Sequence, residues 1–187
     1  KVRGSNLAFL GYVLAIIFLS VNPASPQVTV DTLAIGTVAP SFYASVLDGS
    51  DFFLSHKVGA KAHPNEKAPV ILVFFTTFCI PCRQEIPFLD SLRIEYPQIA
   101  FYLVNIGEEP QIVKEYIQRM NYKMPVLLDH YGQVAKRYQA SITPTLVGIN
   151  VNGQIAFLKR GFQGSDKELI QTNIKKLTDA NLFIEKN

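Results

Sequence analysis

The chain has 187 residues, of which 48% are hydrophobic and 18% charged, so it suits one globular domain with or without a short anchor. Two cysteines cannot form a disulfide scaffold, and 11 glycines without a period exclude a collagen-like repeat. The net charge of +3 falls to +1 without Lys1 and Arg3 (16 basic against 15 acidic side chains), which precede an apolar run. A near-neutral domain has no electrostatic basis for binding nucleic acid, and we expect none among its partners.

Residues 1–26 are predicted to form a signal or anchor segment and linker, followed by one domain over residues 27–187. The uncharged run Leu7–Val21 covers roughly 22 Å as a helix, against about 30 Å for a bilayer core. Asn22 and Pro23 stand where a cleavage site is expected, which favours a retained membrane anchor over a cleaved signal peptide. Both interpretations place the domain outside the cytoplasm, either anchored on the periplasmic side or secreted after cleavage.

Beyond the linker, apolar periodicity and turn residues predict a series of strands and helices. In chain order these are strand pieces over Phe42–Leu47 and Asp51–Leu54, a polar surface loop over Ser55–Ala68, a buried strand over Val70–Phe75, a helix over Cys79–Tyr96, a strand over Ile99–Ile106, a helix over Pro110–Met120, a strand over Pro125–Leu128, a helix over Tyr131–Tyr138, strands over Thr145–Ile149 and Gln154–Leu158, and a helix over Asp166–Leu177. This order predicts a mixed sheet with helices on its faces. Asn152-Gly153 predicts its single antiparallel hairpin.

The chemistry of the chain is concentrated in Cys79-Ile80-Pro81-Cys82, at the junction of a predicted buried strand and a helix. Two cysteines three residues apart on a first helical turn lie within disulfide reach. Unpaired N–H groups and the positive end of the helix dipole stabilise a thiolate there and lower the pKa of the first thiol. We therefore predict attack by the Cys79 thiolate on a disulfide, followed by resolution by Cys82.

Three other interpretations of the two cysteines compete with this one. A structural zinc site would need two more soft ligands, and the chain offers only three scattered histidines. His56 and His63 lie in the polar Ser55–Ala68 loop and are predicted to be solvent-exposed rather than ligands. A purely structural disulfide and a pair of ordinary core cysteines are the remaining alternatives. We predict neither a bound metal nor a cofactor.

The segment Phe74–Pro87 (FFTTFCIPCRQEIP) resembles the active-site segment of the thioredoxin-like proteins, in particular the membrane-anchored TlpA/ResA-like branch. Gly36–Phe42 resembles the N-terminal entry of that branch, Ser141–Thr145 the segment that holds its cis-proline, and Asn150–Ile155 its following hairpin. The resemblance runs from about residue 34 to the C-terminus. It implies an α/β thioredoxin-like fold, with a central mixed β-sheet flanked by helices, and thiol-disulfide oxidoreductase activity.

The resemblance also implies roles for individual residues. It implies that Glu85, three residues after Cys82, exchanges a proton with the resolving thiol; an exposed first-turn acid favoured by the helix dipole is the alternative interpretation. Two positions depart from the family pattern, because Val73 replaces the buried aspartate of ordinary thioredoxins and Phe78 replaces the usual tryptophan. The residues implied to bind substrate are Phe78, Ile80, Pro81, Thr143 and Pro144, the last preceded by a cis peptide bond.

The partners implied by the resemblance are client proteins with disulfides, such as apocytochromes, and a membrane-embedded thiol electron donor. The expected direction of electron flow is reduction of the client. Three alternatives of other classes remain open. A copper-handling protein of the same fold would need a CxxxC spacing. A peroxiredoxin-like peroxidase shares a threonine three residues before the reactive cysteine, as Thr76 stands before Cys79. The third alternative is a non-catalytic subunit of a membrane complex.

Overall fold

The computed structural model describes residues 33–184, with side chains up to residue 179. The predicted anchor Leu7–Val21, and the boundary placed after residue 26, lie outside this range. Within residues 33–184, no helix is both long and apolar enough to cross a bilayer.

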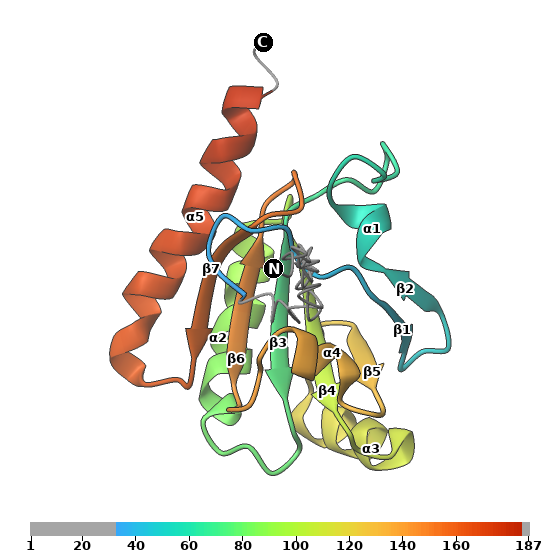
Figure 1. Ribbon diagram of the computed structural model, residues 1–187. Helices are drawn as coiled ribbons and strands as arrows, with labels where there is room; N and C mark the ends of the chain where they lie inside the picture. Colours follow the sequence, from blue (N-terminus) through green and yellow to red (C-terminus); the bar gives the residue numbers. More distant parts are fainter. Residues whose placement is uncertain (1–32, 185–187) are drawn as a thin grey trace, which may run out of the picture. The chain divides into compact units, whose positions relative to one another are not determined.

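A seven-stranded mixed sheet forms the centre of the fold, in the order β2-β1-β5-β4-β3-β6-β7 (Figure 1). Its central strand β3 pairs in parallel with β4 and antiparallel with β6. All six residues of β3 are buried, as its continuous apolar sequence predicts. The strands are β1 (Tyr43–Val46), β2 (Asp51–Phe53), β3 (Val70–Phe75), β4 (Ala100–Ile106), β5 (Val126–Asp129), β6 (Thr145–Ile149) and β7 (Ile155–Arg160).

Helices cover both faces of the sheet and bury two separate apolar clusters. One cluster joins the sheet to α2, α3 and α5, and it includes both cysteines. The other joins the opposite face to α1, α4 and the β1–β2 hairpin. The predicted mixed sheet with helices on its faces is therefore confirmed. The helices are α1 (Leu54–Lys57), α2 (Cys82–Glu95), α3 (Pro110–Met120), α4 (Gln133–Arg137), the 3-10 turn η1 (Gly164–Asp166) and α5 (Lys167–Ile184).

Two expectations for the N-terminal half of the domain are wrong. The β6–β7 hairpin is not the single one, because β1 and β2 also pair antiparallel around Gly49, whose φ is 91°. The stretch predicted as a loop from Ser55 begins within helix α1. Leu54 and Val58, one turn apart, are both buried in the second apolar cluster, and their burial stabilises this turn of helix.

The end of the sheet at β7 is packed unusually closely. Gly148 in β6 lies opposite Phe157 in β7, and a Cβ atom at Gly148 would overlap the Phe157 ring. The ring thus occupies the space that a side chain at Gly148 would need. This packing fixes β7 against the sheet, and β7 carries a charged residue close to the site described next.

Candidate active site

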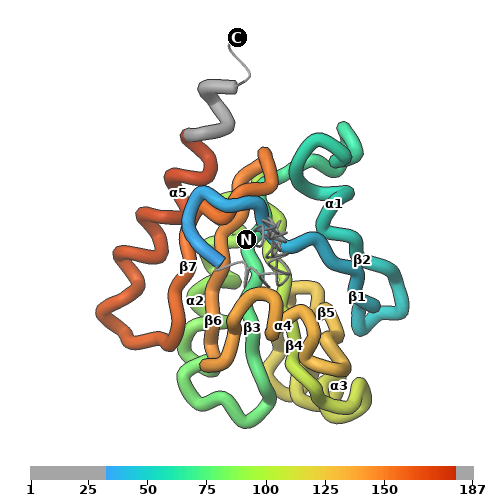
Figure 2. Tube along the Cα trace, in the orientation of Figure 1, coloured from blue at the N-terminus to red at the C-terminus, as the bar shows by residue number. Residues whose placement is uncertain are grey.

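The candidate site lies where β3 ends and β6 begins. Phe74 pairs with Thr145, so the loop after β3 and the loop before β6 emerge at the same edge of the sheet. Figure 2 shows these two loops, green and orange, at the same end of the molecule. The Thr143–Pro144 peptide bond in the second loop is cis, which confirms that prediction. The fold thus brings the CxxC segment and the Thr143-Pro144 segment to one edge.

Cys79 and Cys82 form a disulfide at the N-terminus of α2. The predicted helix start at Cys79 is three residues early, since α2 begins at Cys82 and Pro81 is its N-cap. The backbone N–H of Cys82 donates a hydrogen bond to Sγ of Cys79 at 3.3 Å. Cys79 is 5% exposed and Cys82 is fully buried. An incoming thiol or disulfide therefore reaches the first sulfur more readily than the second.

Exposed apolar side chains surround the disulfide. Phe78 is 72% exposed and Ile80 is 69% exposed, on either side of Cys79. Pro81 and Thr143 are partly buried, and Pro144 is buried. All five residues predicted to bind substrate thus lie on the two loops at this edge, and their contact with a client stays a prediction. Ile142, just before Thr143, is 56% exposed and was not among the predicted residues; its sequence signal is an isolated apolar residue in a turn.

Glu85 lies fully buried on α2, one turn after Cys82. The alternative of an exposed first-turn acid is therefore wrong. Neither carboxyl oxygen has a hydrogen-bond partner among the described residues. Burial raises the pKa of Glu85 to about 8, while the charge of Lys159 lowers it and the charge of Asp166 raises it. The side chain therefore carries a proton between about pH 4.5 and pH 8, where a free glutamate is ionised.

A second carboxylate, Glu108, holds the loop that leads to Cys79. It accepts hydrogen bonds from the Thr77 backbone N–H at 2.8 Å, the Thr77 hydroxyl at 2.5 Å and the Asn105 side-chain amide at 2.6 Å. Thr77 directly precedes the exposed Phe78, so Glu108 ties this loop to the end of β4. No local sequence pattern marks Glu108 as a site residue, because its partner Thr77 lies 31 residues away in the chain.

The two histidines of the Ser55–Ala68 segment stack on each other, with ring centroids 4.0 Å apart. His63 is exposed, as predicted, but His56 is partly covered because it also stacks on Phe53. Nδ1 of His63 lies 3.4 Å from Oε1 of Glu66. Over residues 33–184, no three or more His, Cys, Asp or Glu side chains are grouped so as to hold a metal ion.

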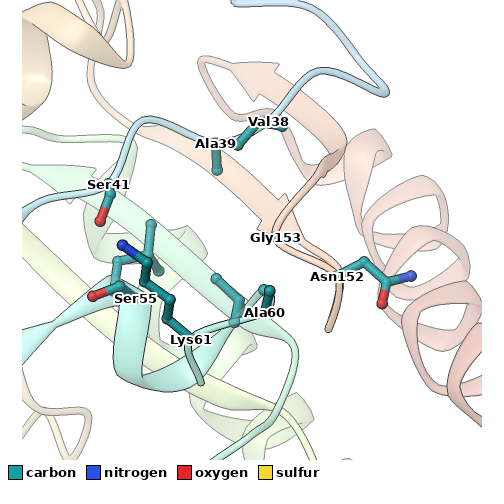
Figure 3. Close-up of a pocket in the computed structure, with 11 residues that line it drawn as sticks. Val38, Ala39, Ser41, Ser55, Ala60, Lys61, Asn152 and Gly153 are labelled. Atoms are coloured by element: carbon teal, nitrogen blue, oxygen red, sulfur yellow. The ribbon is translucent and has the colours of Figure 1, made fainter. Parts of the chain in front are cut away.

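Figure 3 shows a pocket of about 220 Å³ whose lining includes neither cysteine. Val38 and Ala39 of the entry segment, Lys61 and the hairpin residue Gly153 contribute to its lining. Val70 at the start of β3 pairs with Ile149, so the β6–β7 turn lies at the opposite edge of the sheet from the disulfide. The pocket is therefore separate from the candidate active site.

A mixed sheet with a CxxC disulfide after its central strand, and a cis-proline before the adjacent antiparallel strand, defines a thioredoxin-like protein. Residues 35–158 match the AhpC/TSA family. This match covers about two thirds of the chain, and the protein belongs to that family.

Individual relatives agree with the branch that the sequence resembles. The thiol-disulfide oxidoreductase ResA of Geobacillus kaustophilus is 27% identical over 173 residues, covering 91% of this chain and 89% of ResA. The sporulation thiol-disulfide oxidoreductase A of Bacillus subtilis is 26% identical over 155 residues, covering 80% of this chain and 87% of that protein. A crystal structure of a putative thiol:disulfide interchange protein DsbE from Chlorobium tepidum has a TM-score of 0.70 at 26% identity, covering 78% of this chain and 99% of that one. With its Cys79–Cys82 pair, the protein is a thiol-disulfide oxidoreductase of the ResA-like type.

Proposed function

We propose that this protein is an extracytoplasmic reductant that transfers two electrons from its Cys79–Cys82 dithiol to disulfides of client proteins. The observation that carries the proposal is the placement of this disulfide at a strand-to-helix junction, with the first sulfur nearest the surface and the second buried. This is the order of access that attack by Cys79 and resolution by Cys82 require.

The surroundings of Cys79 support reduction as the direction. Among residues 33–184, Sγ of Cys79 accepts one hydrogen bond, from the Cys82 N–H, and the intervening Ile80 and Pro81 bring no charge. A CxxC protein becomes a strong oxidant when its reduced, thiolate form is strongly stabilised. Beyond the helix N-terminus and this one N–H, the CxxC segment adds no charge that would stabilise the thiolate, so the disulfide form stays favoured and the dithiol gives up its electrons readily.

The reaction proceeds in two exchanges. The Cys79 thiolate attacks one sulfur of the client disulfide, forms a mixed disulfide and releases the other client sulfur as a thiolate. The Cys82 thiolate then attacks Sγ of Cys79, forms the Cys79–Cys82 disulfide and releases the second client thiolate. The client is reduced by two electrons and the CxxC pair is oxidised by two. A thiol electron donor, which we propose to be embedded in the membrane, restores the dithiol.

We propose that Glu85 serves the second exchange by accepting the proton of the Cys82 thiol. With a pKa of about 8, Glu85 is close to the ordinary thiol value of about 8.5, and proton transfer between groups of similar pKa has little free-energy cost. The carboxyl lies one turn from Cys82 on the same buried face of α2. Its oxygens have no partner among the described side chains, which leaves them available for this exchange.

We also propose that Leu7–Val21 anchors the domain on the outer side of the membrane, and that the clients include apocytochromes. The apolar run and its flanking positive residues support the anchor, and the resemblance to the TlpA/ResA-like branch supports the client class. Carbonate washing of membranes should leave the protein in the membrane fraction, with residues beyond Ala24 open to external protease. Native protein recovered in the soluble fraction, with its N-terminus just after Pro23, would instead establish a cleaved signal.

The reduction potential of the Cys79–Cys82 pair tests the central proposal. We expect a value nearer to the thioredoxin end, about −270 mV, than to the strongly oxidising end, about −120 mV. Equilibration of the full chain with defined dithiol buffers measures it. A potential at the oxidising end would overturn the reductant assignment, and peroxide consumption faster than disulfide reduction would favour the peroxidase alternative.

A further inference from the structure

The buried Glu85 lies on α2, which covers the side of the sheet to which a lysine of β7 points. Phe157 of β7 belongs to the same apolar cluster as Cys82 and Ile86 of α2. Side chains alternate along a strand, so Lys159, two residues after Phe157, points to the same side of the sheet. Lys159 has a side chain only 20% exposed and pairs in register with the buried Leu146. A cationic residue thus lies on the side of the sheet that α2 covers.

Asp166 holds this lysine in place. Nζ of Lys159 lies 2.6 Å from Oδ2 of Asp166 and donates a hydrogen bond to the Gly161 carbonyl at 2.7 Å. Asp166 is itself fixed, because its Oδ2 accepts the Gln163 N–H at 2.6 Å at the start of η1. Gln163 is the N-cap of η1, so the carboxylate of Asp166 both caps this turn and forms the ion pair with Lys159.

Charged groups from two elements act on Glu85. They are Lys159 on β7 and Asp166 on η1, and their charges work in opposite directions. From α2 itself, the Cys82 thiol is the titratable neighbour one turn away, once the disulfide is reduced. On α5, Lys167 lies over the Phe88 ring, 5.4 Å from its centroid, one turn further along α2.

We propose that Lys159 and Asp166 are positioning residues that set the protonation of Glu85, and with it the pH at which Cys82 resolves the mixed disulfide. The inference rests on the proton-accepting role proposed for Glu85. While Asp166 compensates Lys159, the pKa of the buried carboxyl stays at about 8, and the ionised fraction accepts the Cys82 proton. Without Asp166, Lys159 becomes the free counter-ion of Glu85 and favours its ionisation. Without Lys159, Asp166 is left as an uncompensated negative charge and opposes ionisation.

Two variants that break the same ion pair should shift the pKa of Glu85 in opposite directions. Carboxyl ¹³C chemical shifts of the oxidised full chain report the titration of Glu85, assigned by the signal missing from Glu85→Gln; the disulfide form contains no titrating thiol. We expect Lys159→Met to raise the pKa of Glu85 and Asp166→Asn to lower it, each by about 1. Asparagine keeps an oxygen for the Gln163 N–H, and Lys159→Arg, which retains the charge, should restore the original titration.

Lys57→Met is the matched control. Lys57 forms an ion pair of the same length, 2.6 Å, with Glu66, and its helix α1 packs on the opposite face of the sheet. Its loss should leave the titration of Glu85 unchanged. If Lys159→Met and Asp166→Asn shift the pKa of Glu85 in the same direction, or if neither variant shifts it, the ion pair has only a structural role and the inference is wrong.

The rate of the second exchange separates this inference from the proposed function. Stopped-flow release of glutathione from the Cys79 mixed disulfide, recorded against pH, should move its midpoint in the same directions as the carboxyl titration. If the carboxyl titration shifts as expected while Glu85→Gln leaves the rate profile unchanged, control of the Glu85 proton by the ion pair stands, and both the role of Glu85 in resolution and the effect of the ion pair on that step are refuted. If Glu85→Gln changes the profile and the Lys159 and Asp166 variants do not, the role stands and the inference is refuted.

Discussion

The burial of Glu85 predicts a pH dependence of folding stability that the variant Glu85→Gln should abolish. The pKa of Glu85 is raised from 4.5 to about 8 in the folded state, so the native protein holds this proton more tightly than the unfolded chain. The stabilisation is complete below pH 4.5 and is lost as the pH rises to about 8. At about 1.4 kcal/mol for each pKa unit, the full loss is about 5 kcal/mol, of which about 3 kcal/mol has occurred at pH 7.

Urea unfolding of the oxidised full chain between pH 4 and pH 9 measures this effect, as the difference in free energy of unfolding between the parent and Glu85→Gln. Glutamine leaves a buried polar group in place, so any cost of burying it offsets the two curves by a constant amount. Glu115→Gln, on the exposed side of α3, controls for the loss of one carboxylate. A difference that stays flat from pH 4.5 to pH 8 would refute the assignment of Glu85 as a buried, proton-holding carboxyl.

Three further predictions concern the cysteines, the loop before them and the packing of β7. Cys79→Ser should abolish reduction of a model disulfide, whereas Cys82→Ser should accumulate mixed disulfides with clients, visible on non-reducing gels; faster alkylation of Cys82 than of Cys79 in the reduced protein would reverse the assigned roles. Glu108→Ala removes the acceptor of three hydrogen bonds and should lower the free energy of unfolding by about 1–3 kcal/mol. Hydrogen exchange at the Thr77 amide should become faster, and an unchanged rate would show that Glu108 does not hold the loop. Gly148→Ala should destabilise the fold by about 1–3 kcal/mol in thermal unfolding, because the new Cβ would overlap the Phe157 ring. Gly164→Ala is the matched control, since no atom lies within 4 Å of a Cβ placed there, and equal melting temperatures for the two variants would contradict the packing described.

Much of the fold follows from apolar periodicity. The helix predicted over Pro110–Met120 and the strands predicted over Val70–Phe75 and Thr145–Ile149 have the observed bounds. In these segments local pattern and tertiary burial agree, so the sequence alone is sufficient. The first turn of α1 was missed because its four residues are too few for a periodic signal, and only the burial of Leu54 on the rest of the fold stabilises it.

The residues of the site also fall into those that a local motif predicts and those that only tertiary contacts reveal. Cys79, Cys82 and the cis bond before Pro144 were predicted, because each belongs to a short contiguous motif. The motif identifies Glu85 but does not determine its burial, since burial on α2 depends on which of its faces the sheet covers. Lys159, Asp166 and Glu108 were not identified, because their contacts join residues that no local pattern connects. Val73 replaces the buried aspartate of ordinary thioredoxins, and the structure buries an acid on α2 instead, as Glu85.

The Cys79–Cys82 bridge closes a ring of four residues, so chain entropy accounts for only about 2 kcal/mol of what the bridge contributes to stability. Reduction and unfolding form a closed thermodynamic cycle. Any difference in stability between the disulfide and dithiol forms must therefore equal the difference in reduction potential between the folded site and the unfolded chain, about 30 mV for each 1.4 kcal/mol. In a CxxC reductant, the dithiol form that carries the electrons is therefore less stable towards unfolding than the disulfide form. Each transfer to a client then lets the domain relax into its more stable state, and denaturation curves of the two forms measure this driving force without any redox buffer.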